Sequence, residues 1–319
     1  MLTRNEAARV LRDNNRFLIL THRRPDGDTL GSAAALCLGL RLLGKTAWVL
    51  QNPEVTPRFS FLLEGLTVET PPQDTFIVST DVASPSMLPA QWANLNGKIR
   101  LRIDHHASST SFTQWELVEP DSASCAEIVW ELLRLLQCPA DTAVFRALYV
   151  GISTDTGCFA YGNTTARTHA VTAALMETGI DVYPINKTFF GTKTRRRMAL
   201  EADMLVNADY FDGGRCVFLY VPMSLMERLH ATETDAEDLS SLGRQIEGVD
   251  CAVTFRELRP DVWKLSVRTD KRVNATKVCA RMGGGGHPAA AGCTMEAPLN
   301  EVKEAVLASL RAEVADFEG

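Results

Sequence analysis

Acidic and histidine residues gather at four points along this 319-residue chain, in types and spacings that suit a site for divalent metal ions. The four segments are Thr21–Asp28, Ser79–Asp81, Asp104–His106 and Gly151–Gly157. Carboxylate oxygens mixed with imidazole nitrogens suit Mn²⁺, and also Mg²⁺, Co²⁺ or Fe²⁺, better than the thiolate sites that zinc prefers. Because two cations can share a carboxylate and activate water for attack on phosphorus, the pattern predicts a metal-dependent phosphoesterase.

The charges of these segments point the same way. Their acidic and histidine residues are Asp26, Asp28, Asp81, Asp104 and Asp155, with His22, His105 and His106, and none of the segments contains a lysine. Carboxylates held close together repel one another, so such a group is costly without cations between them. The sequence therefore predicts bound cations on electrostatic grounds as well.

Each segment alone also has an ordinary structural explanation. Asp26-Gly27-Asp28 is typical of a solvated turn, and Asp81 of a helix N-cap. His105-His106 is compatible with a partly buried, hydrogen-bonded pair, and Thr154–Gly157 with a loop. Four such segments in one chain, each directly after an apolar stretch, favour a common site over four unrelated features.

The apolar stretches predict a parallel α/β sheet. Expected strands lie at 17–20, 46–50, 75–79 and 99–103, and a helix rich in Ala and Leu is expected at 30–43, with Gly44 just past its end. Ligands of such sheets bind beyond the carboxyl ends of the strands, so the residues that follow these strands are expected to converge on one edge. Asp155 follows the helical stretch 142–150, which would carry its carboxylate there.

The rest of the chain predicts a second, smaller α/β domain. Strands are expected at 215–221, 250–257 and 262–267, and a closing helix at 299–310. The segment 188–208 predicts a connecting helix whose basic start holds Lys193, Arg195, Arg196 and Arg197, interpreted as a solvated face, with guidance of a polyanion as the alternative. The predicted domains are therefore 1–187 and 209–319, with the active site in the cleft between them.

A run of glycines in the second domain suits the binding of an anion. Gly283 to Gly286 allow a backbone to approach a ligand closely and to offer successive N–H groups, and His287 adds another donor. A flexible surface linker is the alternative. Arg268, at the end of an expected strand, has a planar fork suited to a terminal phosphate, or is an ordinary exposed arginine.

These motifs resemble a known family. His22-x-x-x-Asp26-x-Asp28, Thr80-Asp81, Asp104-His105-His106 and Ser153-Thr154-Asp155-Thr156-Gly157 are similar to the four signature motifs of the DHH phosphoesterase superfamily, which includes RecJ-like exonucleases, manganese pyrophosphatases and cyclic-dinucleotide phosphodiesterases. Ser266–Arg268, Val273-Asn274 and the segment 283–292 resemble the substrate-binding domain found beside many DHH domains. Size and domain pairing are closest to the stand-alone nanoRNase and pAp-phosphatase type.

The resemblance implies a role for each matching residue. It places one metal on His22, Asp26 and Asp81 and a second on Asp28, Asp81, His105 and Asp155, with two Mn²⁺ expected and Mg²⁺ or Co²⁺ as alternatives. Asp81 would bridge the metals, His106 would assist proton transfer, and Asp104 would orient its neighbours. The implied substrate-binding residues are Arg268, Asn274, Gly284, Gly285, Gly286 and His287.

Composition limits the partners. A net charge of −6 argues against binding to long duplex nucleic acid through a basic surface. The chain has no stretch approaching the roughly 20 apolar residues that span a bilayer, so no membrane partner is expected. Eight scattered cysteines without a Cys-x-x-Cys pair fit reduced thiols and a cytoplasmic protein. A homodimer is compatible with the sequence.

The expected activity is hydrolysis of short oligoribonucleotides to nucleoside monophosphates, of pAp to AMP, or of both. A soluble phosphodiesterase for cyclic dinucleotides or pApA is an alternative within the superfamily. A pyrophosphatase or polyphosphatase is a further alternative within the superfamily, although the glycine run and the few basic residues around it are unfavourable signs. A nucleotide-binding regulator without turnover is the alternative from another class.

Overall fold

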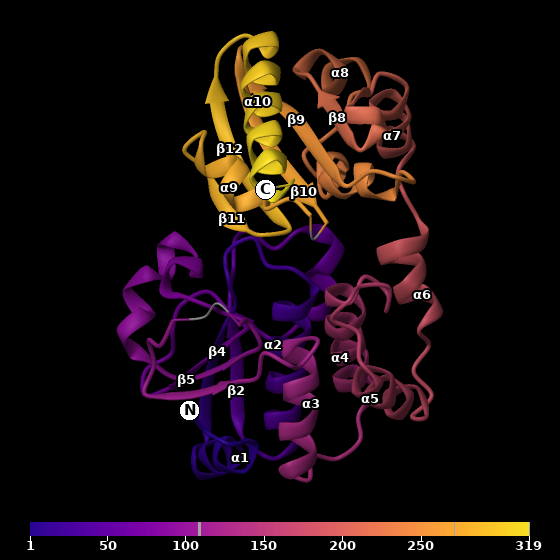
Figure 1. The fold of residues 1–319 in the computed structure, drawn as a ribbon. Helices are drawn as coiled ribbons and strands as arrows, with labels where there is room; N and C mark the ends of the chain where they lie inside the picture. Colours follow the sequence, from indigo (N-terminus) through magenta and orange to yellow (C-terminus); the bar gives the residue numbers. More distant parts are fainter. Residues whose placement is uncertain (108–109, 271, 319) are drawn as a thin grey trace. The chain divides into compact units, whose positions relative to one another are not determined.

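The computed structural model describes residues 1–107, 110–270 and 272–318, and the chain divides into two compact units. Unit 1 spans Met1–Thr192, and unit 2 runs from Lys193 to the C-terminus. Figure 1 shows the ribbon of the described chain, and each unit has hydrophobic cores of its own. The functional domain limits given above, at 187/188 and 208/209, stay predictions.

Unit 1 is built on six parallel strands in the order β3-β2-β1-β4-β5-β6. The strands are β1 (Arg16–Leu20), β2 (Thr46–Leu50), β3 (Thr67–Val68), β4 (Phe76–Thr80), β5 (Ile99–Asp104) and β6 (Trp115–Val118). The predicted parallel α/β sheet is confirmed. From β1 the strand order runs toward one edge of the sheet through β2 and β3, and from β4 it runs toward the other edge through β5 and β6. In parallel sheets, ligands bind at the point between two such strands, beyond their carboxyl ends.

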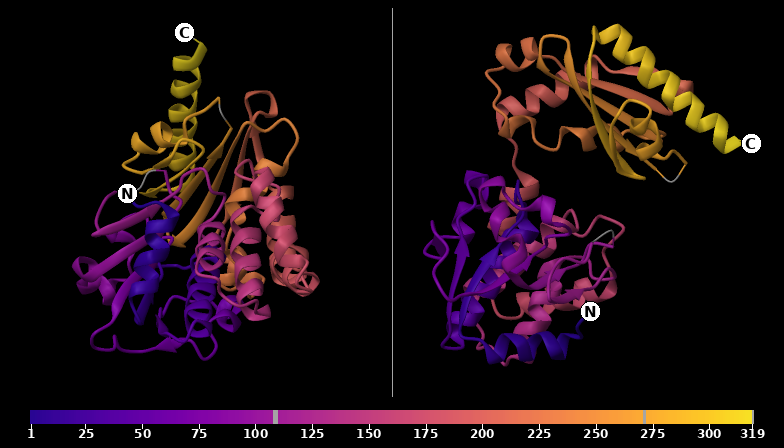
Figure 2. Two further views of the ribbon diagram at one scale, coloured as in Figure 1. Left: turned by 90° about the horizontal axis from the view of Figure 1, so that it is seen from below. Right: turned by 90° about the vertical axis from the view of Figure 1, so that its left-hand side faces the viewer.

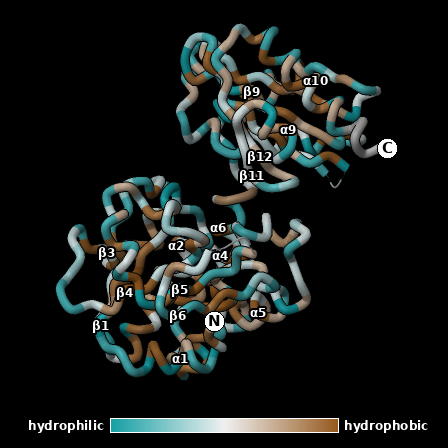
Figure 3. The backbone as a smooth tube through the Cα atoms, turned by 60° about the vertical axis from the view of Figure 1, so that its left-hand side comes forward, coloured by the Kyte–Doolittle hydropathy of each residue, from teal (hydrophilic) through white to brown (hydrophobic). Residues whose placement is uncertain are grey.

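Both faces of this sheet are covered, as expected for parallel strands. The α-helices are α1 (Arg4–Asp13), α2 (Gly27–Leu42), α3 (Cys125–Leu135), α4 (Thr142–Asp155), α5 (Ala166–Met176) and α6 (Tyr183–Asn186), and the 3-10 helices are Pro57–Leu62, Pro85–Met87 and Ala90–Lys98. Phe17 and Ile19 of β1 pack into the core that contains α1 to α4, whereas Leu18 and Leu20 pack on the opposite face. Hydrophobic stretches gather inside the unit (Figure 3).

Two glycines let α2 and α4 pack backbone against backbone. A Cβ atom on Gly31 would lie 2.4 Å from the carbonyl oxygen of Ala147 and 2.9 Å from the backbone nitrogen of Gly151, and one on Gly151 would lie 3.5 Å from the Cα of Asp28. Any larger side chain would force the helices apart. This close approach brings Asp28, in the first turn of α2, beside the end of α4 that carries Asp155.

Unit 2 is built on a mixed sheet in the order β11-β12-β10-β9-β8-β7, with β8 and β9 parallel and the other described pairs antiparallel. The strands are β7 (Asp209–Phe211), β8 (Cys216–Val221), β9 (Cys251–Arg259), β10 (Val262–Thr269), β11 (Gly285–His287) and β12 (Ala290–Glu296). The smaller α/β fold predicted for this part of the chain is confirmed.

The two faces of the second sheet are covered differently. Its helices are α7 (Arg195–Val206), α8 (Met223–Arg228), α9 (Ala275–Ala280) and α10 (Leu299–Glu318), and its 3-10 helices are Asp212–Gly214, Thr234–Ala236 and Leu239–Gln245. Helices α9 and α10 share one core with strands β8, β9, β10 and β12, and α10 lies along this face in Figures 1 and 2. On the other face, α7, α8 and the 3-10 helix Leu239–Gln245 cover β8 and β9.

The connecting helix predicted at 188–208 is not continuous. Residues Lys187–Gly191 form a π-helix, Thr192 is extended, and α7 begins at Arg195, where the hydroxyl of Thr194 accepts from the backbone N–H of Arg197 at 3.0 Å. A threonine N-cap competes with continuation of the preceding turn, so the helix starts later than its apolar spacing predicts.

The basic residues at the start of α7 combine exposure with ion pairing. Lys193, Arg195 and Arg196 are exposed, as the interpretation of a solvated face predicts, but three of the four basic residues also bind a buried carboxylate. Lys193 and Arg197 both bind Glu201, at 2.7 and 2.6 Å, and Arg196 binds Asp235 at 2.8 Å. Both carboxylates are buried, and the arginine and lysine side chains supply the charges that they need.

Among the described residues, no helix combines the length and apolar character required to cross a bilayer.

Candidate metal centre

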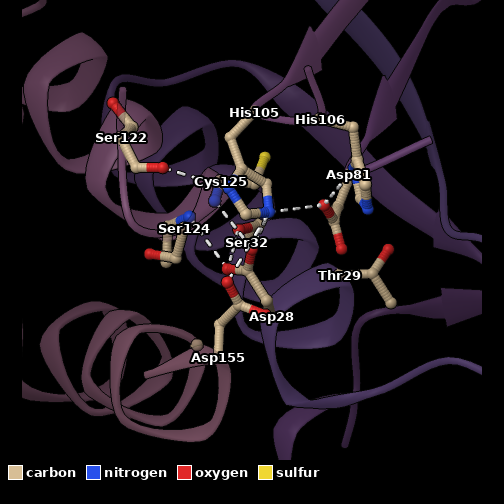
Figure 4. A network of polar contacts seen from close by, with 12 residues as sticks. Asp28, Thr29, Ser32, Asp81, His105, His106, Ser122, Ser124, Cys125 and Asp155 are labelled. Atoms are coloured by element: carbon tan, nitrogen blue, oxygen red, sulfur yellow. Dashed lines mark hydrogen bonds and ion pairs between the residues drawn. The ribbon is translucent and has the colours of Figure 1, made fainter. Parts of the chain in front are cut away.

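The structure brings the predicted residues of unit 1 together at the carboxyl ends of its strands. Three groups each place their ligand atoms within 4.8 Å of one another, and they are His22, Asp26 and Asp81; Asp28, His105 and Asp155; and Asp81, His105 and His106. Asp81 and His105 each belong to two groups, so the three form one aspartate–histidine cluster. Figure 4 shows His105 between Asp81 on one side and Asp28 and Asp155 on the other.

The first group joins the ends of β1 and β4. His22 Nε2 lies 3.6 Å from Asp26 Oδ1 and 3.5 Å from Asp81 Oδ2. Asp26 is the N-cap of α2, and its Oδ1 also accepts from the backbone N–H groups of Asp28 and Thr29 at 3.0 and 3.1 Å. The N-cap alternative that the sequence offered for Asp81 does not hold, because Ser84 precedes the next helix. Asp26 is an N-cap instead, in place of the solvated turn that was its alternative, and the cap holds its carboxylate toward His22.

Asp81 has two features of a functional residue. Its backbone is left-handed, with φ of 61°, a conformation that costs free energy for any residue except glycine and is tolerated best by Asn and Asp. Its side chain is buried, and among the described residues its Oδ1 atom has no hydrogen-bond partner. A buried carboxylate oxygen without a partner is costly, so this atom is suited to a cation.

The second group joins β5, α2 and α4. His105 Nε2 lies 3.8 Å from Asp28 Oδ2, 3.6 Å from Asp155 Oδ2 and 3.5 Å from Asp81 Oδ1. His105 is therefore the residue that connects the two halves of the cluster. Asp155 is the last residue of α4, one turn beyond the end of the helical stretch predicted from the sequence.

Backbone carbonyl groups orient both of these imidazoles. The Nδ1 atom of His22 lies 2.8 Å from the carbonyl oxygen of Arg23, and that of His105 lies 3.1 Å from the carbonyl oxygen of Ser122. A carbonyl only accepts, so in each ring Nδ1 carries the proton and donates it. The Nε2 atoms, which face the carboxylates, keep the lone pair that binds a metal.

His106 is held differently. Its Nδ1 lies 2.8 Å from Asp104 Oδ1, which also accepts from the backbone N–H groups of His105 and His106 at 2.9 and 3.3 Å. The hydrogen bond to Asp104 raises the pKa of His106, an effect that burial partly offsets. Asp104 is fully buried, and it fixes both the backbone and the ring of the residues that follow it.

Asp28 belongs to the first turn of α2, and its carboxylate lies at the N-terminus of α3. Its two carboxylate oxygens accept from the backbone N–H groups of Cys125 and Ala126, the first two residues of α3, at 2.7 and 2.9 Å. The positive end of a helix dipole favours a carboxylate there. Burial nevertheless raises the pKa of Asp28 well above its usual value, and the charges of Asp81 and Asp155 raise it further.

The cluster as a whole attracts positive charge. Burial lowers the pKa of His22, but hydrogen bonds to Asp26 and Asp81 outweigh burial and raise the pKa to about 11. Burial raises the pKa of Asp155 to about 7, with His105 opposing the shift and neighbouring aspartates adding to it. His22 and Asp155 therefore hold their protons tightly, and these protons offset the negative charge of the cluster. A bound metal ion would offset the same charge. The oriented nitrogens, the unpartnered oxygen of Asp81 and this charge imbalance fit a divalent cation.

Two asparagines that the sequence did not single out support the site. The side-chain amide of Asn52 donates to the carbonyl oxygen of His22 at 2.8 Å, and its oxygen accepts from the N–H of Glu54 at 3.0 Å. The amide of Asn163 donates to the backbone oxygen of Asp155 at 3.1 Å and to its Oδ2 at 3.4 Å. Asn52 follows β2, so the rule on strand ends could have found it. Nothing in the sequence marks Asn163.

The structure also places the residues predicted to bind substrate, all in unit 2. Arg268 lies on β10, and His287 lies on β11 at the edge of the sheet. Asn274 is the N-cap of α9, and its Oδ1 accepts from the N–H groups of Thr276 and Lys277 at 3.0 and 3.3 Å. This explains Asn274 structurally, and a substrate role for it stays a prediction.

The glycine run is not the open row of N–H groups that the sequence suggested. The N–H groups of Gly283 and Gly284 donate to the carbonyl oxygens of Ala280 and Cys279 at 3.1 and 2.8 Å, because the run directly follows α9 and satisfies its last carbonyls. Gly285 and Gly286 belong to β11, which pairs with β12. Glycine is still required, since a Cβ on Gly284 would lie 2.4 Å from the Cβ of Cys293.

Comparison with known proteins identifies the family. The family model described as "DHH family, N-terminal domain" matches residues 16–152, and the model of the DHHA1 domain matches residues 216–316. The bifunctional oligoribonuclease and PAP phosphatase NrnA of Thermus thermophilus is 31% identical over 300 residues, which cover 93% of this chain and 89% of that protein. The chain belongs to the DHH family. The protein of the same name from Bacillus subtilis is 23% identical over 297 residues, covering 92% and 93%.

Solved structures show the same DHH fold. An exopolyphosphatase-related protein from Bacteroides fragilis matches with a TM-score of 0.84 at 19% identity, covering 99% of this chain and 97% of that one. An exonuclease RecJ bound to manganese matches with a TM-score of 0.55 at 14% identity, covering 99% and 95%. The resemblance inferred from the four motifs is therefore confirmed at the level of family and fold.

Proposed function

We propose that this DHH-family protein is a divalent-metal-dependent phosphoesterase that hydrolyses short oligoribonucleotides to nucleoside monophosphates and pAp to AMP. The observation that carries the proposal is the aspartate–histidine cluster, in which Asp81 is shared between two groups of ligand atoms. The names of the Thermus and Bacillus relatives, which cover nearly the whole chain, support this substrate class.

The proposed ligand sets follow the two halves of the cluster. His22, Asp26 and Asp81 would hold one ion, and Asp28, Asp81, His105 and Asp155 a second, with Mn²⁺ favoured by the mixed oxygen and nitrogen donors. When bound, such ions supply a hydroxide at neutral pH and stabilise the charge that develops on the phosphoryl oxygens. Two ions and their identity as Mn²⁺ are part of the proposal.

His106 and Asp104 have separate tasks. The carboxylate of Asp104 accepts the Nδ1 proton of His106, which leaves the Nε2 atom of that ring for a phosphoryl oxygen or a leaving group. Because the same hydrogen bond raises the pKa of His106, the imidazolium form is favoured, and this form can donate a proton from Nε2. Asp104 thus positions the proposed general acid and favours its charged form.

Unit 2 is proposed to bind the remainder of the nucleotide. Arg268 and His287 are the described residues best suited to this, since β10 and β11 carry them on one face of the sheet. A cytoplasmic location is proposed from the cysteines, because all eight are free thiols in the structure. A homodimer stays a prediction, for which light scattering of the purified protein is the measurement.

The test is a comparison of substrates with a matched pair of variants. Purified protein in Mn²⁺ is given pAp, a dinucleotide, a 24-nucleotide RNA, pApA, a cyclic dinucleotide and pyrophosphate, and product release is measured. We expect turnover of pAp and the dinucleotide, weak turnover of the others, and loss of both activities in Asp81→Asn. Asp74→Asn is the control, because Asp74 is also a left-handed aspartate, with φ of 53°, but is exposed.

Each other outcome has a defined meaning. Preference for the cyclic dinucleotide or pApA would replace the substrate class and keep the chemistry. Preference for pyrophosphate or the long RNA would contradict the role given to unit 2. If no substrate were hydrolysed in any divalent metal, a nucleotide-binding regulator would become the better explanation of the same fold.

A further inference from the structure

Arg268 is half-buried, and it forms no ion pair with the described residues, although Asp238 lies close enough to raise its pKa. Its guanidinium donates a hydrogen bond to the carbonyl oxygen of Val267 at 3.2 Å, and no carboxylate of the described residues forms an ion pair with it. Burying a charged group without an opposite charge is costly. An arginine kept in this state is suited to an anion that arrives from outside the chain.

A second arginine lies beside it. The 3-10 helix Leu239–Gln245 lies flat on the sheet because Gly243 has no side chain, and a Cβ there would lie 2.5 Å from the Cβ of Ala252. Ala252 is the partner of Arg268 in the pairing of β9 with β10. The residue after Gly243 is Arg244, whose backbone therefore lies close to the pair of strands that carries Arg268.

The two guanidinium groups are close enough to influence each other. Burial lowers the pKa of Arg268, the nearby Asp238 raises it, and Arg244 lowers it again. Arg244 is exposed and, like Arg268, forms no ion pair within the described parts of the chain. Two like charges held side by side repel unless an anion lies between them.

His287 lies on the same face. In the register of the sheet, His287 pairs with Ala290, Ala290 with Arg268, and Arg268 with Ala252. Side chains of directly paired residues point to the same face of a sheet. The row therefore carries two basic side chains separated by an alanine, and Arg244 approaches the same row from the covering 3-10 helix.

We propose that Arg244 completes a phosphate site with Arg268 on this face of unit 2, and that the pair selects substrates ending in a phosphate monoester over those ending in a hydroxyl group. A terminal monoester carries about 1.5 to 2 negative charges near pH 7, whereas an internal diester carries one. Two planar forks can each make paired hydrogen bonds to its oxygens. This inference rests on the proposed function for its substrate class and adds a residue and a selectivity.

Binding without turnover tests the site directly. The full-length protein is titrated with AMP, and separately with adenosine, by calorimetry in EDTA, so that the aspartates of unit 1 repel the phosphate and only unit 2 is probed. We expect Arg244→Ala to weaken AMP binding by roughly tenfold or more, the usual effect of losing a charge-assisted hydrogen bond, and to leave adenosine binding unchanged. Arg244→Lys should recover part of the loss, since it keeps the charge but not the fork.

A matched control separates this site from general charge effects. Arg259 lies on β9 and forms a solvent-exposed pair with Glu296 at 3.2 Å, so Arg259→Ala removes the same charge from the same unit. This control should bind AMP like the wild type. In kinetics, Arg244→Ala should raise KM for a 5′-phosphorylated dinucleotide more than it lowers kcat, and should reduce the preference for that substrate over the unphosphorylated dinucleotide.

Several results would overturn the inference. These are AMP binding that Arg244→Ala leaves unchanged, equal loss of AMP and adenosine binding, equal loss in Arg259→Ala, or no AMP binding by the wild type in EDTA. Failure of the proposed function is distinguishable, because it would appear as absence of turnover in Mn²⁺ while AMP binding still depended on Arg244.

Discussion

Two buried aspartates, Asp81 in unit 1 and Asp235 in unit 2, sit in opposite electrostatic surroundings. Asp235 accepts hydrogen bonds from Thr194 Oγ1 at 2.5 Å, from Arg196 Nε at 2.8 Å and from the N–H of Thr232 at 2.9 Å. Asp81 has left-handed backbone geometry, and its Oδ1 has no hydrogen-bond partner among the described residues. The carboxylate of Asp235 has hydrogen-bond donors around it, whereas one oxygen of Asp81 has none in the part of the chain that the structure describes.

The pKa shifts around these residues follow the same division. Burial raises the pKa of Asp235, but hydrogen bonds from Thr194, Thr232 and Arg196 outweigh it and lower the pKa below the usual value. In the cluster around Asp81, burial and neighbouring carboxylates raise the pKa of Asp28 well above its usual value. Satisfied charge is what a structural network needs, whereas unsatisfied charge indicates a site that binds a cation.

The largest expected effect is on turnover. Asp81→Asn keeps the shape of the side chain and a residue that tolerates left-handed geometry, but removes the charge shared by both halves of the cluster. We expect hydrolysis of pAp in Mn²⁺ to fall by about a thousandfold or more, as for loss of a residue central to a metal site. Initial rates measured beside Asp74→Asn check this, and a loss of less than tenfold would mean that Asp81 is not a shared ligand.

The next effect is stabilisation by metal. Because an ion that binds only the folded state stabilises it by mass action, Mn²⁺ at a hundred times its Kd should add about 2.7 kcal/mol to the free energy of unfolding of unit 1. Unit 2 should not respond. Hydrogen exchange of backbone amides, with and without Mn²⁺, distinguishes the two units. Equal protection of both units would contradict a metal site confined to the cluster.

Neutralising Asp235 should lower the stability of unit 2 without changing metal binding. Asp235→Asn removes an acceptor on which several donors depend and leaves buried groups unpaired, so unit 2 should lose about 2 kcal/mol of stability at pH 7. Mn²⁺ binding should be unaffected. The measurement is hydrogen exchange or urea unfolding. Asp212→Asn is the control, because among the described residues the carboxylate of Asp212 forms only an exposed pair with Arg311 at 3.4 Å.

The pH dependence of this effect has a definite sign. The pKa of Asp235 is lower in the folded state, so its contribution is fully present above the unfolded value of about 3.9 and is lost as pH falls below that value. The difference in stability between wild type and Asp235→Asn should therefore shrink between pH 5 and pH 3. A difference that stayed constant over this range would show that Asp235 does not act through its charge.

The smallest effect is expected at the neighbouring arginine. Arg195 lies beside Arg196 at the start of α7, but it is exposed and forms no ion pair among the residues that the structure describes. Arg195→Ala should change stability by less than about 0.5 kcal/mol, as is usual for a surface substitution. Arg196→Ala, measured in parallel, should cost more, and equal effects would mean that the contact with Asp235 is unimportant.

The sequence was sufficient for the sheet of unit 1 and for the convergence of its acidic residues. Strands β1, β2, β4 and β5 each lie within a residue or two of their predicted limits. The reason is local, since a buried parallel strand has a short apolar run, and its last residue marks where a ligand-binding side chain must follow. The assignment of the acidic and histidine residues to particular metals or catalytic steps stays a prediction.

Segments whose structure depends on distant partners were predicted less well. The basic start of α7 is exposed as predicted, but nothing nearby in the sequence indicates that Arg196 also binds Asp235, 39 residues further on. The sequence also does not indicate that the amides of Gly283 and Gly284 bind the last carbonyl groups of α9, because this contact depends on the fold. Asn163 and Arg244 escaped notice for the same reason.

Residue types and their order along the chain thus determined the family, the parallel sheet and the set of acidic and histidine residues that meet at its edge. Only the tertiary structure decided which of the charged residues have partners. Gly31 and Gly151 let two helices approach so that Asp28 meets Asp155. Gly243 lets the 3-10 helix that carries Arg244 lie close to Ala252, the strand partner of Arg268. Charge balance is a sum over neighbours in space, and the sequence lists neighbours only along the chain.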